Sequence, residues 1–210
     1  MMLARRQRFP NVCAVAFLVA AIATNAPAVA DDFTPEERAS LEHGGEVVQL
    51  LDYARGAHRY VGGLSYRVVS ASPDALSTIL RDVSRYAELF TNLSSATLQS
   101  ISPTGLARVR VEHKFGPFSG GYTLMLAFTD EGKLGRFWVD ATDPGVLGDG
   151  WGFFRLTPLA PGGAGEVRTL VTYAVLFELS SSVLRTMFEP RIQRIALSFP
   201  SRLADAARRP

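Results

Sequence analysis

The chain has 210 residues, of which 47% are hydrophobic and 20% charged, with a formal net charge of +2 and one cysteine. This composition excludes a disulfide scaffold, a collagen-like or disordered chain, and a polytopic membrane protein. It fits one globular domain with an additional segment at one end.

The first 30 residues have the order of a secretory signal. Three arginines among the first eight residues form a basic head, an apolar run follows from Val12 to Thr24, and Ala28-Val29-Ala30 offers the small residues of a cleavage site. The run is about thirteen residues long, whereas a membrane-spanning helix needs roughly twenty. We therefore expect residues 1–30 to be a signal peptide that is cleaved near Ala30. The alternative is an uncleaved N-terminal anchor.

Cleavage would change the charge and the chemistry of the chain. The single cysteine, Cys13, would leave with the signal, so the mature protein would have no disulfide, no thiolate metal ligand and no cysteine nucleophile. Three of the 22 basic residues and none of the 20 acidic ones would also leave, which gives the mature chain a net charge of −1. Nothing in this balance indicates a nucleic-acid partner.

The mature chain begins with the pattern of one helix and two strands. Thr34-Pro35-Glu36-Glu37 combines a capping hydroxyl, a proline where no donor is needed and an acid three residues after the cap, so it predicts a helix start. Gly44-Gly45 should end this helix. Strands are expected over Glu46–Leu51 and Tyr60–Ser70, with Gly62-Gly63 as a candidate bulge in the second.

A second helix should begin at Ser72-Pro73-Asp74. Apolar residues recur at helical spacing from Leu76 to Val83 beyond this cap. A short turn through Tyr86 and Phe90 is expected to follow before the chain enters a region of strands.

From Ala96 to Leu179 the hydrophobic period is two, and short glycine-bearing turns separate the segments. The pattern predicts a curved antiparallel meander that belongs to a sheet of about seven strands. Two of these strands carry alternating residues that should face the interior. The inward sets are Ala107, Val109, Val111, His113 and Phe115, and Thr169, Val171, Tyr173, Val175 and Phe177.

The chain closes with a long helical pattern, in which apolar residues step by three or four from Leu184 to Ala206. Pro190 and Pro200 interrupt it, and we expect a kink or break near each, because proline removes a backbone hydrogen bond and collides with the preceding turn. A sheet that wraps around this helix would meet it closely in the middle and diverge at the ends. The space between them would be an apolar cavity, or alternatively would be filled by the same side chains.

Several segments resemble the START-like, or SRPBCC, superfamily. They are Ser70–Asp74, the end of the following helix at Asp82–Phe90, the strand at Gly152–Leu159, and Arg168–Tyr173 with the terminal helix after it. The resemblance implies an α+β helix-grip fold of the birch-pollen-allergen type, a curved antiparallel sheet around a long C-terminal helix. It also implies a tunnel for lipids, sterols, quinones, polyketides or other hydrophobic molecules. The sub-groups it suggests are the coenzyme-Q-binding START proteins and the polyketide cyclase and dehydrase group.

This superfamily includes both binding proteins and enzymes, so function has to be argued from the site. The histidines at 43, 58 and 113 have no metal-ligand spacing, and neither a metal nor another cofactor is expected. His113 on the inner face could act as an acid or base on a bound polyketide, hydrogen-bond a ligand, or be a satisfied core histidine. Tyr173 is a second candidate anchor. Because two isolated polar groups do not make a catalytic set, binding is favoured over catalysis.

We therefore predict an exported, periplasmic or extracellular protein with a signal peptide (1–30), an N-terminal helix (31–45) and a START-like ligand-binding domain (46–207). It would carry or sequester a hydrophobic small molecule, such as a lipid, an isoprenoid or a sterol-like compound. The alternative is a polyketide cyclase or aromatase that uses His113 as acid and base. The residues expected to line the tunnel are Val109, Val111, His113, Phe115, Phe137, Phe154, Val171, Tyr173, Val175, Phe177, Phe188, Ile192 and Ile195.

The last thirty residues suggest a second partner. They carry six arginines against two acids, on a helix that is expected to be amphipathic. Such a helix beside a lipid tunnel could make transient contact with an anionic membrane surface, although arginines often only solvate an outer face. The residues in question are Arg185, Arg191, Arg194, Arg202, Arg208 and Arg209.

Overall fold

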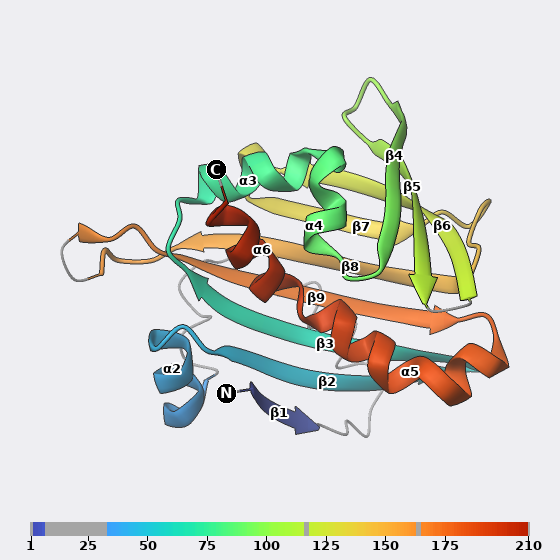
Figure 1. Ribbon diagram of the computed structural model, residues 1–210, viewed down its shortest axis with the longest axis horizontal. Helices are drawn as coiled ribbons and strands as arrows, with labels where there is room; N and C mark the ends of the chain where they lie inside the picture. Colours follow the sequence, from blue (N-terminus) through green and yellow to red (C-terminus); the bar gives the residue numbers. More distant parts are fainter. Residues whose placement is uncertain (1, 7–32, 116–117, 163–164, 210) are drawn as a thin grey trace.

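The structure, a computed structural model, describes residues 2–6, 33–115, 118–162 and 165–209. These residues form one nine-stranded sheet in the order β1-β2-β3-β9-β8-β7-β6-β5-β4, with helices packed against it (Figure 1). In this order each strand pairs antiparallel with the next, except that β1 pairs in parallel with β2. Most of the predicted signal peptide, from residue 7 to residue 30, lies outside the described residues.

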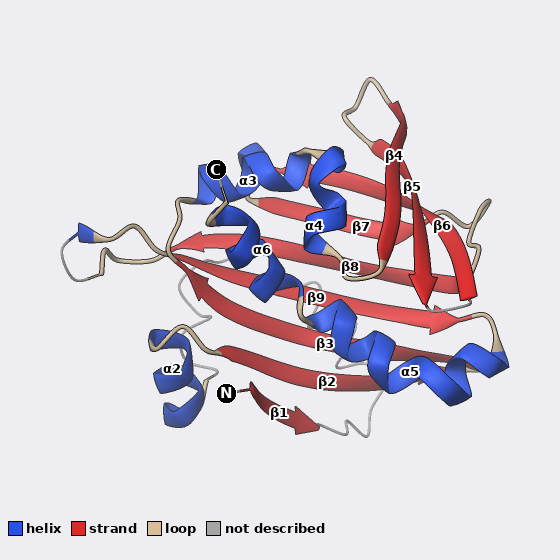
Figure 2. Ribbon diagram, viewed as in Figure 1, coloured by secondary structure: helices blue, strands red, loops and turns tan. Residues whose placement is uncertain are grey.

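Figure 2 shows how the strands and helices are distributed. The strands are β1 (Met2–Arg6), β2 (Glu46–Arg55), β3 (His58–Val69), β4 (Leu93–Ile101), β5 (Ala107–Phe115), β6 (Phe118–Thr129), β7 (Leu134–Val139), β8 (Leu147–Pro158) and β9 (Thr169–Leu179). The helices are α2 (Pro35–Glu42), α3 (Pro73–Arg81), α4 (Tyr86–Leu89), α5 (Ser182–Leu197) and α6 (Phe199–Ala207), with short 3-10 helices η2 (Val83–Arg85) and η3 (Asp130–Gly132).

Both predicted helix starts are confirmed by their capping bonds. The Thr34 hydroxyl accepts from the Glu37 amide at 3.2 Å, and the Glu37 carboxylate accepts from the Thr34 amide at 2.9 Å, which together make a capping box at α2. Helix α2 ends before Gly44, whose φ of +72° suits a residue without a side chain. At α3 the Ser72 hydroxyl accepts from the Ala75 amide at 3.2 Å.

The predicted meander is confirmed, but the sheet is larger than expected. Strands β2 to β9 form eight antiparallel strands instead of about seven, and β4 begins at Leu93, three residues before the period-two region. Gly62-Gly63 does not form a bulge, because β3 pairs without a register shift on both sides. A β-carbon at Gly62 would collide with the carbonyl oxygen of Val175 on β9. The glycine therefore permits close approach of two strands.

The two faces of the sheet bury separate apolar clusters. The main cluster joins the concave face to α3, α4 and α6, and includes Val48 and Val171. A second cluster on the opposite face joins Phe33 and Leu41, beside and in α2, to Val47 and Leu170. Because neighbouring residues of a strand point to opposite faces, β9 contributes to both clusters, which explains why it is apolar on both faces.

The C-terminal helix is broken at one of the two predicted positions. The helix ends at Leu197 and α6 begins at Phe199, with Pro200 at the start of α6, where its missing amide costs no hydrogen bond. Helix α5, by contrast, continues through Pro190, so of the kink or break expected there a break is excluded. Figure 1 shows α5 and α6 lying across the same face of the sheet. Within the described residues, no helix is both long enough and apolar enough to span a membrane.

Candidate ligand-binding cavity

A cavity of about 160 Å³ lies between the concave face of the sheet and the helices that cover it. Residues from strands β5 to β9 form its walls, and residues of α3, α4, α5 and α6 close it. Most lining side chains are aliphatic or aromatic, and none of the lining residues in the described part of the chain is Asp, Glu, Lys or Arg. The interior is therefore partly hollow, as the curved sheet suggested.

Nine of the thirteen residues predicted to line the tunnel do line this cavity. They are Val111, His113, Phe137, Phe154, Tyr173, Val175, Phe177, Ile192 and Ile195. Val109 and Val171 do not, because both are completely buried in the packed part of the main cluster. Phe188 is half-buried on α5 away from the cavity, and the side chain of Phe115 lies outside the described part of the structure.

Several lining residues escaped the sequence analysis. Tyr122 and Leu124 lie on β6, where both faces of the strand are apolar and alternation cannot identify the inward set. Phe199 lines the cavity from the first residue of α6. The sequence predicted only a kink or break near Pro200, which does not place the ring of Phe199 relative to the sheet.

Aromatic rings form a continuous row that runs from the sheet to helix α6. The ring of Phe137 stacks on Tyr173 with centroids 5.8 Å apart, and Tyr173 stacks on Phe199 at 4.4 Å. Phe137 and Tyr173 lie on β7 and β9, with β8 between them. Gly152 of β8 is paired with Phe137, and a β-carbon there would collide with the Phe137 ring. Gly152 therefore allows that ring to reach across β8 to Tyr173.

The cavity contains one hydrogen-bonded polar pair. His113 Nε2 and Tyr122 Oη lie 3.0 Å apart, and their rings stack with centroids at 5.4 Å. They meet because β5 and β6 place Tyr122 opposite Val111, diagonal to His113, while Gly120 stands directly opposite the histidine. Burial lowers the pKa of His113 to about 4, against an opposing effect of Glu112, and burial raises the pKa of Tyr122. Both groups are therefore neutral at pH 7.

Tyr173 brings a different kind of polar group to the cavity. It is 4% exposed, and burial raises the pKa of its hydroxyl. Among the described residues, no hydrogen bond reaches this hydroxyl. Tyr86, which also lines the cavity, differs because its hydroxyl donates to the Leu80 carbonyl at 2.9 Å. Tyr173 thus remains available to bind a polar atom of a guest, whereas Tyr86 does not.

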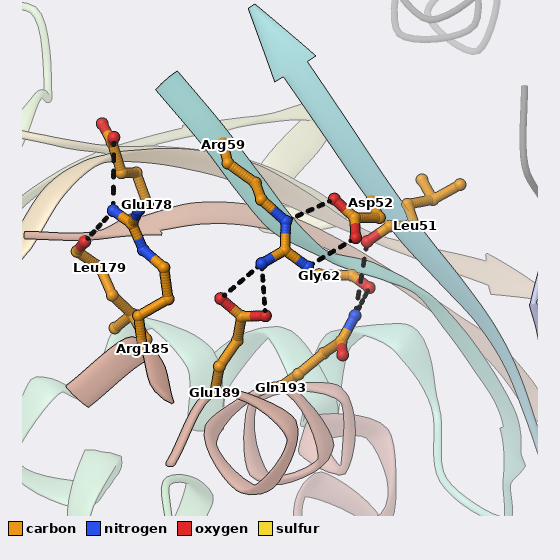
Figure 3. A network of polar contacts seen from close by, with 9 residues as sticks. All are labelled: Leu51, Asp52, Arg59, Gly62, Glu178, Leu179, Arg185, Glu189 and Gln193. Carbon is orange, nitrogen blue, oxygen red and sulfur yellow. Dashed lines mark hydrogen bonds and ion pairs between the residues drawn. The ribbon is translucent and has the colours of Figure 1, made fainter. Parts of the chain in front are cut away.

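Polar contacts hold α5 over the sheet (Figure 3). The Arg59 guanidinium joins Asp52 at 2.7 Å to Glu189 of α5 at 3.1 Å. One turn further along, the Gln193 amide donates to the Gly62 carbonyl at 2.7 Å. Ile192 and Ile195 of the same helix line the cavity. Helix α5 therefore closes the cavity and is held by these polar contacts as well as by apolar residues, such as Leu197, that pack in the main cluster.

The architecture is a START-like, helix-grip fold, which confirms the predicted α+β class. Comparison with solved structures agrees. The chain is similar to TTHA0849 from Thermus thermophilus (16% identity, 69% of this chain and 94% of that one, TM-score 0.54). It is also similar to the Zhui aromatase/cyclase from Streptomyces sp. R1128 (18% identity, 72% and 94%, TM-score 0.56).

A third similar structure is the di-domain ARO/CYC StfQ from the steffimycin biosynthetic pathway, at 11% identity and a TM-score of 0.51. The match covers 81% of this chain and 53% of StfQ, so this chain spans about half of that protein. No family model and no curated protein matches the sequence. At these identities the likeness establishes the fold, and function has to be argued from the cavity.

Proposed function

We propose that this protein binds a hydrophobic small molecule in the cavity and carries or sequesters it. The observation that supports this most directly is the hollow itself. A cavity of about 160 Å³ with apolar walls and few polar groups suits a guest that leaves water readily. A protein that used these side chains only to stabilise its fold would gain by packing them together, because interiors are normally filled to crystal-like density.

We propose further that the ligand is a lipid, an isoprenoid or a sterol-like compound, as the sequence suggests. An engineered protein cavity of about 150 Å³ binds benzene, so the enclosed space here holds roughly one ring or an equivalent length of chain. Ser119 is exposed and yet lines the cavity, so the hollow reaches the surface near the start of β6. A longer ligand would therefore have one part enclosed and the rest extending outward.

Mass spectrometry of the protein purified from its own host tests the proposal. We expect an organic extract to contain a hydrophobic molecule in a near-equimolar amount, and an intact mass that corresponds to residues 31–210 after export and cleavage near Ala30. An extract without any such molecule, together with no binding of added apolar compounds, would remove the basis for the carrier function. An intact mass of the full chain would contradict cleavage.

A second candidate function, cyclisation of a polyketide-like chain, is favoured by the His113–Tyr122 pair inside the cavity. The neutral imidazole can accept a proton, and Tyr122 orients it through the 3.0 Å contact. If the protein is such an enzyme, His113→Ala should lower turnover of a polyketide substrate by roughly 100-fold or more and leave its binding constant nearly unchanged. Equal turnover by both proteins would exclude the role of His113, and no turnover by the native protein would favour the carrier.

We further propose that α5 docks on an anionic membrane surface while the ligand is exchanged. Its outer side carries Val183 and Met187, which are 52% and 64% exposed, at helical spacing with Arg191 and Arg194. Both arginines are exposed, and within the described residues their side chains make no hydrogen bond or ion pair. Exposed apolar side chains next to unpaired cations are complementary to an anionic bilayer.

Not all six predicted arginines contribute equally to this surface. Arg185 turns inward and donates to the Leu179 carbonyl at 2.9 Å, and Arg208 pairs with Asp205 at 2.7 Å. Arg202 and Arg209 belong to α6 and the residues after it, apart from the exposed side of α5. The proposed membrane contact therefore rests on Arg191 and Arg194.

A further inference from the structure

We infer that the cavity selects an uncharged aromatic ring that carries a hydrogen-bond-accepting oxygen, and that Tyr173 is the residue that recognises this oxygen. The inference rests on the proposed function, because it names the class of ligand held in the same cavity. Three properties of the walls support it: their lack of charge, the size and shape of the space, and the one lining tyrosine whose hydroxyl is not already hydrogen-bonded within the described residues.

The walls discriminate against charged groups. None of the lining residues in the described segments carries a formal charge at pH 7, and buried His113 remains neutral there because its pKa lies near 4. A carboxylate or phosphate that entered this space would lose its hydration without gaining a cation, which makes its burial strongly unfavourable. The carboxylate of a fatty acid and the phosphate of a phospholipid are therefore poor candidates for the enclosed part of a ligand.

The size and shape of the space favour a flat ring. The volume of about 160 Å³ is close to the size of a protein cavity that admits one benzene. The stacked rings of Phe137, Tyr173 and Phe199 form an aromatic wall that runs from the sheet to α6, and their planes lie within 28° of each neighbour. Such a wall offers offset-stacked or edge-to-face contacts to an aromatic guest, and these contacts add to the affinity gained by apolar burial.

The requirement for an oxygen follows from the hydroxyl of Tyr173. Within the described residues this hydroxyl has no hydrogen-bond partner, although the side chain is 4% exposed. Tyr122 and Tyr86, which also line the cavity, already bond to His113 and to the Leu80 carbonyl. Because Tyr173 lines the cavity, a ligand oxygen that accepts the proton of this hydroxyl would gain a hydrogen bond in an apolar surrounding. A ketone, quinone or ether oxygen on the ring meets the requirement.

Calorimetric titration of the ligand-free, full-length protein with three compounds of similar size tests this inference. The probes are acetophenone, ethylbenzene and phenylacetate, which differ in bearing a neutral acceptor oxygen, no oxygen, or a negative charge. We expect acetophenone to bind roughly tenfold more tightly than ethylbenzene, in line with one neutral hydrogen bond. Phenylacetate should bind at least tenfold more weakly than acetophenone.

The matched variants are Tyr173→Phe and Tyr86→Phe, which each remove one hydroxyl from the cavity wall. Tyr173→Phe should abolish the preference for acetophenone over ethylbenzene and leave the affinity for ethylbenzene unchanged. Tyr86→Phe should retain the preference, because its hydroxyl is already engaged by Leu80. If Tyr173→Phe does not fold, the infrared carbonyl stretch of acetophenone bound to the native protein provides a second measurement. It should lie at lower frequency than in an alkane, as expected of a hydrogen-bonded carbonyl.

Each outcome separates this inference from the proposed function. Equal affinity for phenylacetate and acetophenone, a preference that survives Tyr173→Phe, or an unshifted carbonyl stretch would overturn the inference. If none of the probes binds but a long-chain lipid is extracted from the purified protein, the carrier function stands and the ring selectivity is wrong. If neither probes nor extracted molecules bind, both proposals fail.

Discussion

Replacing Val175 with arginine should deprive the protein of its ligand. Val175 lies on β9, is 8% exposed and lines the cavity. The arginine side chain stays charged at all accessible pH values, and burying its guanidinium among apolar residues without an anion costs several kcal/mol. We expect either a folded protein whose organic extract contains no ligand, or a protein without a cooperative thermal transition. Mass spectrometry of the extract and circular dichroism distinguish the two results.

The control for this substitution is Val167→Arg. Val167 is 55% exposed and lies outside the cavity, so the same chemical change there should leave both the ligand and the thermal midpoint unaltered. Ala196→Leu provides a milder variant, since the larger side chain on α5 occupies part of the cavity without adding charge. A folded Val175→Arg protein that still carries a full complement of ligand would contradict the assignment of the cavity as the binding site.

The largest expected effect on membrane binding comes from the outer side of α5. Each arginine near an anionic surface contributes about 1 kcal/mol, so the double variant Arg191→Gln/Arg194→Gln should bind vesicles of phosphatidylcholine and phosphatidylglycerol roughly 30-fold more weakly. Binding of the native protein should also weaken as the ionic strength rises toward about 0.15 M, where the screening length falls to roughly 8 Å. Co-sedimentation with vesicles measures both effects.

A matched control removes the same charge elsewhere. Arg38 on α2 and Arg136 on β7 are exposed and lie on other elements, so Arg38→Gln/Arg136→Gln should bind these vesicles nearly as well as the native protein. Equal losses in both double variants would mean that only net charge matters and would refute a specific contact through α5. Absent or salt-independent binding by the native protein would also reject the docking surface.

The sequence predicted best those helix boundaries that depend on residues close together along the chain. The caps at Thr34 and Ser72 predicted the starts of α2 and α3 because their side-chain oxygens bond to amides only three residues away. Pro200 marked the boundary of α6 for a similar reason. Pro190 predicted a kink or break, and the helix continues through it without a break. A single-residue signal gives no information on how the surrounding packing compensates.

The sequence also predicted which residues of the strands face inward, but it predicted only part of the cavity lining. Val111 and Val109 alternate with charged residues on β5 and share one face, yet the first lines the cavity and the second is sealed in the packed core. Alternation reports the face of a side chain. It does not report how far the opposite helix lies from a given position along the strand, which depends on the curvature of the whole sheet.

By itself, then, the sequence determined the α+β class, the caps, the meander and the set of side chains that avoid water, because each depends on near neighbours or on simple periodicity. Only the tertiary structure decided which of those side chains face a hollow and which polar atoms meet inside it. The pairing of His113 with Tyr122 requires the register of β5 and β6, and the reach of Phe137 to Tyr173 requires Gly152 on the strand between them. Such contacts join residues distant along the chain, and their geometry exists only once the strands have paired.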